Sequence, residues 1–334
     1  TAATRAALEG LLSRIPQHSA TITLPDGETV TLPVSSCVLT KDSCTCGVTK
    51  DAGDDPDVTN GYTIFSTVSL ADIPGVRFLP GEGVGTVPLP GIGIPVGDPA
   101  INPTPRRMIT GEIERLLHTH GTLSGVSVRI SVPGGSELAQ KTFNPKLGIT
   151  GGISIIGTSG IVRPFSSEAF VNSIRKEIQV ARALGCTELV INSGAKSENY
   201  LRSRFPHLPP QAFVHYGNYI GDTLRLAEEE GIAHLTMGIM IGKAVKLAEG
   251  HLDTHSRNVI MNRDFIATLA RESHCSPESV ARISGITLAR ELWELFADTP
   301  AFFALLVDRC LAVCRPLLPH TSLDIMLVPE HSQR

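Results

Sequence analysis

The stretch AHLTMGIMIGKAVKLAEG, residues 233–250, contains the pattern that decides the fold class. Its apolar run at 234–239 is typical of a buried strand, and residues 243–249 have the spacing of an amphipathic helix. Comparable apolar segments occur earlier, at 188–191 and 212–215. Because strands that alternate with helices form parallel sheets, this half of the sequence predicts a Rossmann-like α/β domain with a mainly parallel sheet.

We place this α/β domain at residues 151–334. It is expected to open with a short apolar strand at 153–156, followed by the glycine-rich loop 157–160 and a helix. The apolar residues 323–328 are expected to form its last strand.

The first part of the chain, residues 1–150, has a different pattern and predicts an α+β domain with glycine-rich loops. A first helix is expected at 2–15, where apolar residues recur at helical spacing. Apolar and threonine residues alternate on both sides of Asp26-Gly27, which predicts a hairpin. Residues 51–105 are rich in Gly, Pro and Asp and predict turns, and 126–132 predicts a strand.

Length and composition agree with two folded domains. The chain has 334 residues, of which 42% are hydrophobic and 19% charged, and single cores rarely exceed about 250 residues. The formal net charge of −4 and the scattered basic residues argue against a nucleic-acid partner. No window of roughly 18 residues is apolar enough to span a bilayer, so no membrane association and a cytoplasmic location are expected.

The seven cysteines are irregularly spaced, which predicts free thiols. Cys44 and Cys46 form a Cys-x-Cys pair without a matching second pair, so no protein-bound metal is expected.

Two glycine motifs resemble nucleotide-binding signatures but fail on their context. Residues 81–85 (GEGVG) are followed by Pro88 and Pro90, where the helix of a common Rossmann methyltransferase would run. Residues 238–243 approach a phosphate-binding loop but are one residue short and continue with Ala244 in place of Ser or Thr.

The segment DAGDDPD, residues 51–57, contains four aspartates. They are explained either as a solvated turn whose carboxylates cap their own backbone, or as a charged loop that meets cations. The residues alone leave both readings open.

The order of several blocks along the chain is similar to that of the cobalt-precorrin-5B C1-methyltransferase family, the CbiD family. The likeness extends in register through about residue 260. The blocks are residues 50–61 (KDAGDDPDVTNG), 81–85, 91–109 (GIGIPVGDPAINPTPRRMI), 141–162 (KTFNPKLGITGGISIIGTSGIV), 217–221 (GNYIG) and motifs between 242 and 256.

The resemblance implies S-adenosylmethionine-dependent C1-methylation of cobalt-precorrin-5B to cobalt-precorrin-6A in anaerobic cobalamin (vitamin B12) biosynthesis. S-adenosyl-L-methionine is the implied methyl donor, and cobalt enters only as part of the tetrapyrrole substrate. Hand-over of the corrin product to other cobalamin-biosynthesis enzymes is an implied partnership, and a homodimer is the assembly that we expect.

The resemblance also suggests site residues. The catalytic candidates are Asp54, Asp55 and His255. The cofactor-binding candidates are Gly83, Gly85, Gly157, Thr158, Ser159 and Gly160. The substrate-binding candidates are Asn102, Arg106, Lys141, Asn144, Asn218 and Lys243.

Family members carry a Gly-Tyr-Thr-Thr-Gly motif immediately before the first helix. The present sequence opens at Thr1-Ala2-Ala3, inside the equivalent of that helix, so any ligand contact that the motif supplies would be missing. Two other functions stay open: a nucleotide- or phosphate-handling enzyme that uses residues 157–160 or 238–243 as an anion cradle, and a non-catalytic tetrapyrrole carrier.

Overall fold

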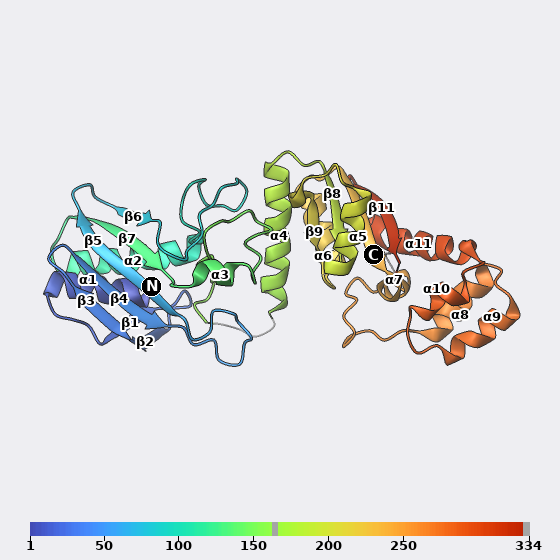
Figure 1. Ribbon diagram of the computed structural model, residues 1–334, viewed down its shortest axis with the longest axis horizontal. Coiled ribbons are helices and arrows are strands. Elements are labelled where there is room, and N and C mark those ends of the chain that lie inside the picture. Colours follow the sequence, from blue (N-terminus) through green and yellow to red (C-terminus); the bar gives the residue numbers. More distant parts are fainter. Residues whose placement is uncertain (162–165, 330–334) are drawn as a thin grey trace. The chain divides into compact units, whose positions relative to one another are not determined.

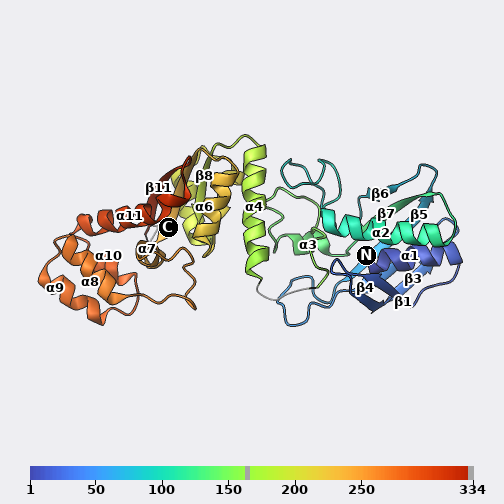
Figure 2. The same cartoon turned by 180° about the vertical axis from the view of Figure 1, so that it is seen from behind.

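The computed structural model describes residues 1–161 and 166–329 and divides into two compact units, Thr1–Ser167 and Glu168–Arg334 (Figures 1 and 2). The division corresponds to the predicted α+β and α/β halves. Its boundary falls after Ser167 and not after residue 150, because residues 151–155 pair with earlier parts of unit 1.

Unit 1 is built on a five-stranded sheet in the order β3-β4-β5-β7-β6. All its pairings are antiparallel except that of β6 with β7. Its core lies between the sheet and two helices, α1 and α2. The elements are α1 (Ala2–Ser13), β3 (Ser36–Leu39), β4 (Ser43–Thr49), β5 (Thr63–Ala71), β6 (Val76–Leu79), α2 (Pro103–Thr119), β7 (Gly125–Ser131) and α3 (Gly135–Ala139).

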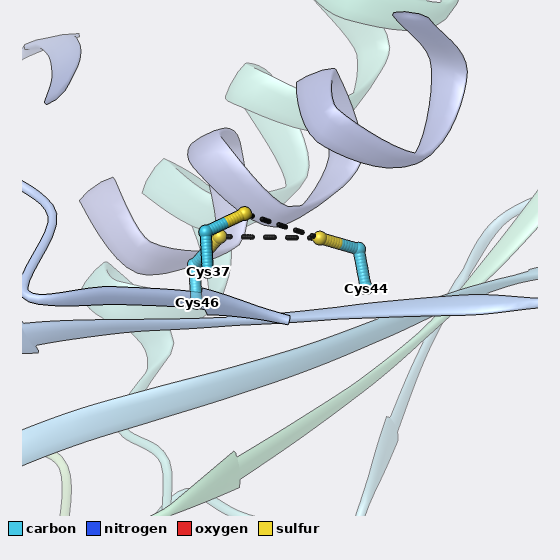
Figure 3. A group of neighbouring side chains, drawn as sticks. All are labelled: Cys37, Cys44 and Cys46. Atoms are coloured by element: carbon cyan, nitrogen blue, oxygen red, sulfur yellow. Dashed lines mark hydrogen bonds between the residues drawn. The ribbon is translucent and has the colours of Figure 1, made fainter. Parts of the chain in front are cut away.

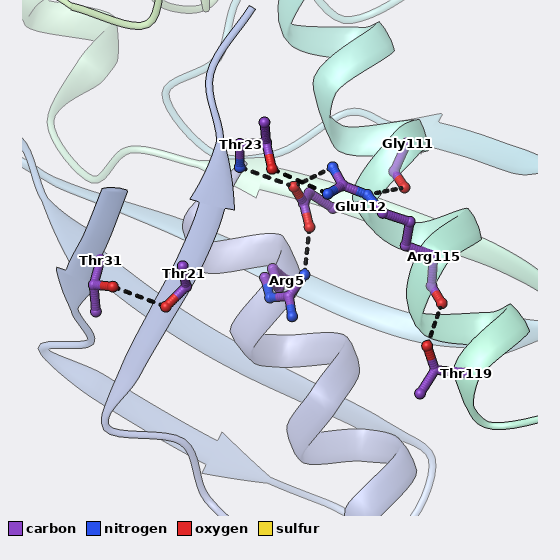
Figure 4. Close-up of polar contacts among 8 residues, drawn as sticks. All are labelled: Arg5, Thr21, Thr23, Thr31, Gly111, Glu112, Arg115 and Thr119. Carbon is purple, nitrogen blue, oxygen red and sulfur yellow. Dashed lines mark hydrogen bonds and ion pairs between the residues drawn. The ribbon is translucent and has the colours of Figure 1, made fainter. Parts of the chain in front are cut away.

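The predicted hairpin is confirmed as β1 (Ser19–Thr23) paired with β2 (Thr29–Pro33). It is held to both helices by the buried carboxylate of Glu112 on α2 (Figure 4). Glu112 accepts hydrogen bonds from Arg5 at 2.5 Å, from Arg115 at 2.6 Å and from the backbone N–H of Thr23 at 3.3 Å. This one acid therefore joins α1, α2 and β1.

The interpretation of residues 51–105 as turns is wrong in part, because β5, β6 and the start of α2 lie in that segment. On β5, residues such as Ser66 and Val68 are fully buried. Thr67 on the opposite side hydrogen-bonds Thr45 of β4 at 2.8 Å. Small hydroxyl residues thus take positions that a search for apolar alternation overlooks.

The expected strand at 153–156 is not part of the parallel sheet. Within the described residues it forms isolated bridges in unit 1, Ile153 with Val84 and Ile155 with Ile101. The glycine-rich loop 157–160 therefore does not lead from a sheet strand into a helix of the α/β unit. The backbone N–H and C=O groups of this short apolar segment form hydrogen bonds with loops of unit 1.

Unit 2 contains a four-stranded sheet in the order β11-β10-β8-β9, and all its pairings are parallel, as predicted. Its strands are β8 (Glu188–Asn192), β9 (Phe213–His215), β10 (His234–Met240) and β11 (Ser322–Val328). The connecting helices are α4 (Ser167–Ala183), α5 (Ala195–Arg204), α6 (Ile220–Glu229) and α7 (Ile241–Ala248).

Helices cover both faces of this sheet. Val190 of β8 packs with Leu201 of α5 on one face. Leu189 and Ile191 join the main core with α4, α6 and α7 on the other face. Alternate side chains of one strand thus enter two helical layers.

The last part of unit 2 is helical before the chain returns to β11. The helices are α8 (Arg263–Glu272), α9 (Pro277–Arg282), α10 (Glu291–Leu295) and α11 (Pro300–Cys314). Among the described residues, every helix is too short or too polar to cross a bilayer.

Candidate functional site

The order in which the chain adds strands to the parallel sheet of unit 2 reverses between β8 and β10. The chain leaves β8 through α5 and reaches β9 on one side, whereas it leaves β10 and ends in β11 on the other side. Open parallel sheets bind ligands outside the carboxyl ends of the strands at such a switch point. The loops that follow β8, β9 and β10 are therefore the places to search for a site.

β8 ends at Asn192, and the loop Ser193-Gly194 leads from it directly into α5. The buried Asn192 side chain donates to the carbonyl of Val214 at 3.1 Å and accepts from the N–H of Gly194 at 3.2 Å. Ser197 in the first turn of α5 donates to the Gly194 carbonyl at 2.8 Å. These bonds fix a short strand–loop–helix turn at the switch point.

Lys243 lies in the first turn of α7, after β10. Its ammonium donates to the carbonyl of Gly217 and to the side-chain oxygen of Asn218, the latter at 2.8 Å. It lies 5.7 Å from the centre of the buried Tyr216 ring. Two predicted substrate-binding residues, Asn218 and Lys243, are thus brought into direct contact.

The electrostatics of this cation depend on its burial. Burial lowers the pKa of Lys243 to about 8, and the neighbouring charge of Lys246 acts in the same direction, against the carboxylate of Asp253. At neutral pH the group is therefore mainly protonated and attracts anions, and it loses its charge at mildly basic pH.

The segment 253–255 is hydrogen-bonded to Asn218, the partner of this lysine, and to Lys246 on the same helix. The N–H of Thr254 donates to the Asn218 carbonyl at 3.1 Å, and Lys246 donates to the Thr254 carbonyl at 3.2 Å. The hydroxyl of Thr254 is buried and has no hydrogen-bond partner among the described residues. A buried hydroxyl without a partner is rare in folded proteins and marks this turn as unusual.

His255 follows directly, and its Nδ1 accepts the N–H of Arg257 at 3.1 Å. In the neutral ring the proton then lies on Nε2, so His255 presents a donor away from its own backbone. The carboxylate of Asp253 holds the same turn, because it accepts from the N–H of His255 at 2.9 Å and from Asn258 at 2.8 Å.

A groove of about 920 Å³ begins at this turn and runs along α8 and α9. Its size lies at the upper end of the range, about 300–1,000 Å³, that is usual for small-molecule sites. Its lining includes the basic side chains of His251, Arg263 and Arg271 and the acidic side chains of Glu249 and Asp264.

Two predicted glycines of unit 1, Gly83 and Gly85, lie in a tightly packed region. A Cβ added at Gly83 would lie 1.9 Å from the carbonyl oxygen of Val132, and one at Gly85 would lie 2.4 Å from a methyl carbon of Ile149 and 2.8 Å from the carbonyl oxygen of Gly152. Packing within unit 1 therefore requires glycine at both positions, whatever ligand they contact.

Three predicted substrate residues support the same packed region. Asn144 is buried and donates to the Gly152 carbonyl at 2.8 Å. Arg106 donates to Ile101, Pro99 and Asp98 at 2.9 to 3.0 Å. Asn102 precedes the first turn of α2 without capping it through its side chain. These contacts give Asn144 and Arg106 a structural task in this state.

The acidic loop is partly explained as a self-capped turn. Lys50 pairs with Asp57, and Asp51 accepts the N–H of Gly53 at 2.8 Å. The side chains of Asp54 and Asp55, in contrast, have no hydrogen-bond or ion-pair partner in residues 1–161 and 166–329. Their charges are left to solvent or to a ligand.

Most of the remaining candidates are exposed. Lys141, Gly157, Thr158 and Gly160 lie at the surface of unit 1, and Ser159 is half-buried and hydrogen-bonds Ile161 of its own loop. These residues belong to unit 1, whereas Lys243 and His255 belong to unit 2.

Sequence reasoning missed Asn192, Ser193, Tyr216 and Thr254. A usable signal existed for the first two, because they follow the predicted strand at 188–191 and precede a glycine. Thr254 carries no signal of its own, since its burial depends on the fold of the 251–258 segment.

Comparisons with known proteins agree with the predicted family. The family model described as CbiD matches residues 1–164, and the model described as CbiD, C-terminal domain, matches residues 253–333. A protein of Geobacillus kaustophilus named cobalt-precorrin-5B C(1)-methyltransferase is 45% identical over 319 residues, which are 95% of this chain and 85% of the relative. A protein of the same name from Prosthecochloris aestuarii is 44% identical over 98% of this chain and 90% of the relative.

A crystal structure of a cobalamin biosynthesis protein (cbiD) from Archaeoglobus fulgidus is 23% identical, with a TM-score of 0.39 and 81% of each chain covered. This likeness is too low to carry structural detail across.

Proposed function

This chain belongs to the CbiD family, and from that premise we propose that it transfers a methyl group from S-adenosylmethionine to C1 of cobalt-precorrin-5B. The relatives' shared name supports the reaction and the substrate. The donor is inferred from the chemistry of methyl transfer, in which a sulfonium is a reactive methyl carrier. The cytoplasmic location, the homodimer and hand-over to other enzymes of the pathway remain predictions.

In the proposed step the nucleophilic ring carbon attacks the methyl group in line with the sulfur. The new carbon–carbon bond forms as the sulfur–carbon bond breaks, and the sulfur keeps the electron pair as a neutral thioether. Because the sulfonium charge disappears, strong carboxylate contact with it would favour the ground state. The protein's main task is therefore to align two ligands and exclude water.

Our placement of the site is supported by the contact between Lys243 and Asn218 at the switch point of the parallel sheet. We assign the end of β8 and the loop after it, Asn192-Ser193-Gly194, to the cofactor side of this crevice, since adenosine-containing ligands bind at such loops in doubly wound folds. We propose that Lys243 binds a carboxylate of the macrocycle, because its side chain is mainly cationic at neutral pH and partly buried.

The adjoining groove supports a ligand with several carboxylates. Arg263 and Arg271 lie among its lining residues, and guanidinium groups recognise carboxylates through paired hydrogen bonds. His255 lies three residues before Asn258, which lines the groove, and it presents its Nε2 donor. We propose that it orients a polar group of the substrate near the reacting carbon.

Asp54 and Asp55 of unit 1 stay catalytic candidates, because their charges are not used within the acidic loop. The glycine segments around Gly83 and Gly85 are proposed to shape backbone that approaches a ligand closely. These two roles rest on the family likeness and on the unused charges.

Calorimetric titration tests this placement. S-adenosylhomocysteine should bind wild-type protein in preference to ATP, whereas a phosphate-handling enzyme would prefer ATP. Ser193→Ala and Gly194→Val should weaken S-adenosylhomocysteine binding by about tenfold or more, equal to about 1.4 kcal/mol. Thr158→Val, in the exposed loop of unit 1, is the matched control. If only the Thr158 variant loses binding, the cofactor side has been assigned to the wrong loop.

A further inference from the structure

Three cysteine side chains of unit 1 converge on one point of its sheet (Figure 3). The sulfur of Cys44 lies 3.6 Å from that of Cys37 and 4.0 Å from that of Cys46, and all three lie within 4.8 Å of one another. Cys37 on β3 is paired with Cys46 on β4, and Cys44 lies two residues before Cys46. The strand register therefore places all three on one face.

Backbone groups of α1 and of the segment that follows it lie against two of the three sulfurs. The adjacent residue of α1 is Gly10, where an added Cβ would lie 3.2 Å from the Cys44 sulfur and 3.7 Å from that of Cys37. The backbone N–H of Gln17 points at the Cys37 sulfur at 3.4 Å. Amide donors of this kind stabilise the thiolate form of cysteine ligands.

The spacing matches a thiolate metal centre. Tetrahedral Zn²⁺ with Zn–S bonds of about 2.3 Å requires sulfurs roughly 3.8 Å apart, and the observed contacts of 3.6 and 4.0 Å lie on both sides of that value. The third pair, Cys37 and Cys46, lies within 4.8 Å.

We propose that Cys37, Cys44 and Cys46 bind one Zn²⁺ ion through three thiolates. Binding releases three thiol protons to solvent and leaves a site of net charge −1, whereas Cu⁺ on the same ligands would leave −2 in a largely apolar core. The smaller buried charge favours zinc. No fourth His, Cys, Asp or Glu of the described residues belongs to this group, so the fourth position is left to a small solvent ligand.

The cluster has a structural consequence. It links the edge strand β3 to β4 beneath α1 and would fix the edge of the unit 1 sheet. Cys37 is partly exposed while Cys44 and Cys46 are fully buried, so the ion has a way in from the side of Cys37. This proposal is independent of the methyl-transfer assignment, which involves no protein metal.

Zinc binding to the reduced, full-length chain tests the proposal. In competition with a chromogenic chelator, wild-type protein should bind one equivalent of Zn²⁺. Cys37→Ser should lower the affinity by about 100-fold, at or above the upper range for loss of a supporting group. Cys186→Ser, in unit 2, changes a partly exposed thiol that lies outside the cluster and should bind as wild type does.

Cobalt binding to wild-type protein provides a readout that does not depend on the folding of a variant. Co²⁺ added to wild-type protein should produce the near-ultraviolet charge-transfer band of thiolate ligands, and this band should be weaker in Cys37→Ser. The proposal is overturned if wild-type protein binds no stoichiometric Zn²⁺ and shows no such band. It is also overturned if Cys37→Ser and Cys186→Ser bind zinc equally.

Discussion

Lys243 and Asn218, 25 residues apart in the sequence, meet at the carboxyl edge of the parallel sheet, where the lysine donates a 2.8 Å hydrogen bond to the asparagine side chain. The same lysine donates to the carbonyl of Gly217. A cation held by two neutral acceptors keeps its charge for a third, anionic partner. The contact therefore describes a site that is preorganised for a carboxylate.

This cation makes anion binding dependent on pH. Burial lowers the pKa of Lys243 from 10.5 to about 8, so its charge is present below about pH 8 and is lost as the pH rises through that value. The affinity for cobyrinic acid, a stable corrin with several carboxylates, should therefore fall between pH 7 and pH 9. Lys243→Arg should remove this fall, because arginine stays charged. Absorbance titration of the corrin measures both, and an unchanged pH profile in the Arg variant would rule out Lys243 as the titrating group.

The acidic loop allows charge and structure to be separated. Asp57→Asn removes the partner of Lys50, and it should lower the free energy of unfolding by about 0.5–1 kcal/mol. Asp54→Asn and Asp55→Asn should change it by less than about 0.5 kcal/mol.

If the two unpartnered charges serve catalysis, only Asp54→Asn and Asp55→Asn should slow methyl transfer without changing the stability of the fold. The rate should fall by about tenfold for each 1.4 kcal/mol of lost transition-state stabilisation. Denaturant melts and single-turnover rates provide the two readouts. Wild-type rates in both variants would leave this loop as a solvated turn.

Two glycines with similar backbone angles test the packing of the glycine segments. Gly83 and Gly93 have φ values of 69° and 79°, but only at Gly83 would a Cβ meet other backbone, 1.9 Å from Val132. Gly93→Ala should cost about 1 kcal/mol for the left-handed backbone alone, whereas Gly83→Ala should cost more than about 4 kcal/mol or prevent unit 1 from folding. Thermal melts compare the two, and equal losses would show that the packing at Gly83 is looser than described.

The buried acid Glu112 is expected to stabilise unit 1. Glu112→Gln keeps the shape but removes the charge that pairs with Arg5 and Arg115. The loss should be about 1.5–3 kcal/mol, as for hydrogen bonds to charged groups. Arg115→Gln, in which a half-exposed partner is changed, should cost less than about 1 kcal/mol. Urea denaturation of both variants gives the comparison, and the reverse order would contradict the central place of Glu112.

The α/β half could be predicted from sequence because its strands are continuous apolar runs between amphipathic helices. Residues 188–191, 234–239 and 323–328 all became neighbouring parallel strands. The first half was harder, because β4 and β5 bury Cys44, Cys46 and Ser66 where an apolar pattern was sought.

Candidate site residues that directly follow a strand could be predicted from the sequence. Lys243 and Asn218 were found from family motifs and lie together in the structure. The resemblance also proposes Gly157 to Gly160 as cofactor residues, and the segment before them, expected in the parallel sheet, instead forms bridges inside unit 1. Which strand enters which sheet is decided by long-range packing, which a local motif does not contain.

The central claim is that this chain methylates C1 of cobalt-precorrin-5B. The most direct measurement is a single-turnover reaction of excess protein with cobalt-precorrin-5B and S-adenosylmethionine that carries an isotope-labelled methyl group. The account predicts that the label appears on C1 of the macrocycle together with one equivalent of S-adenosylhomocysteine, and that Lys243→Met lowers the rate. Tight binding of both ligands without transfer, or label on another ring carbon, would contradict it.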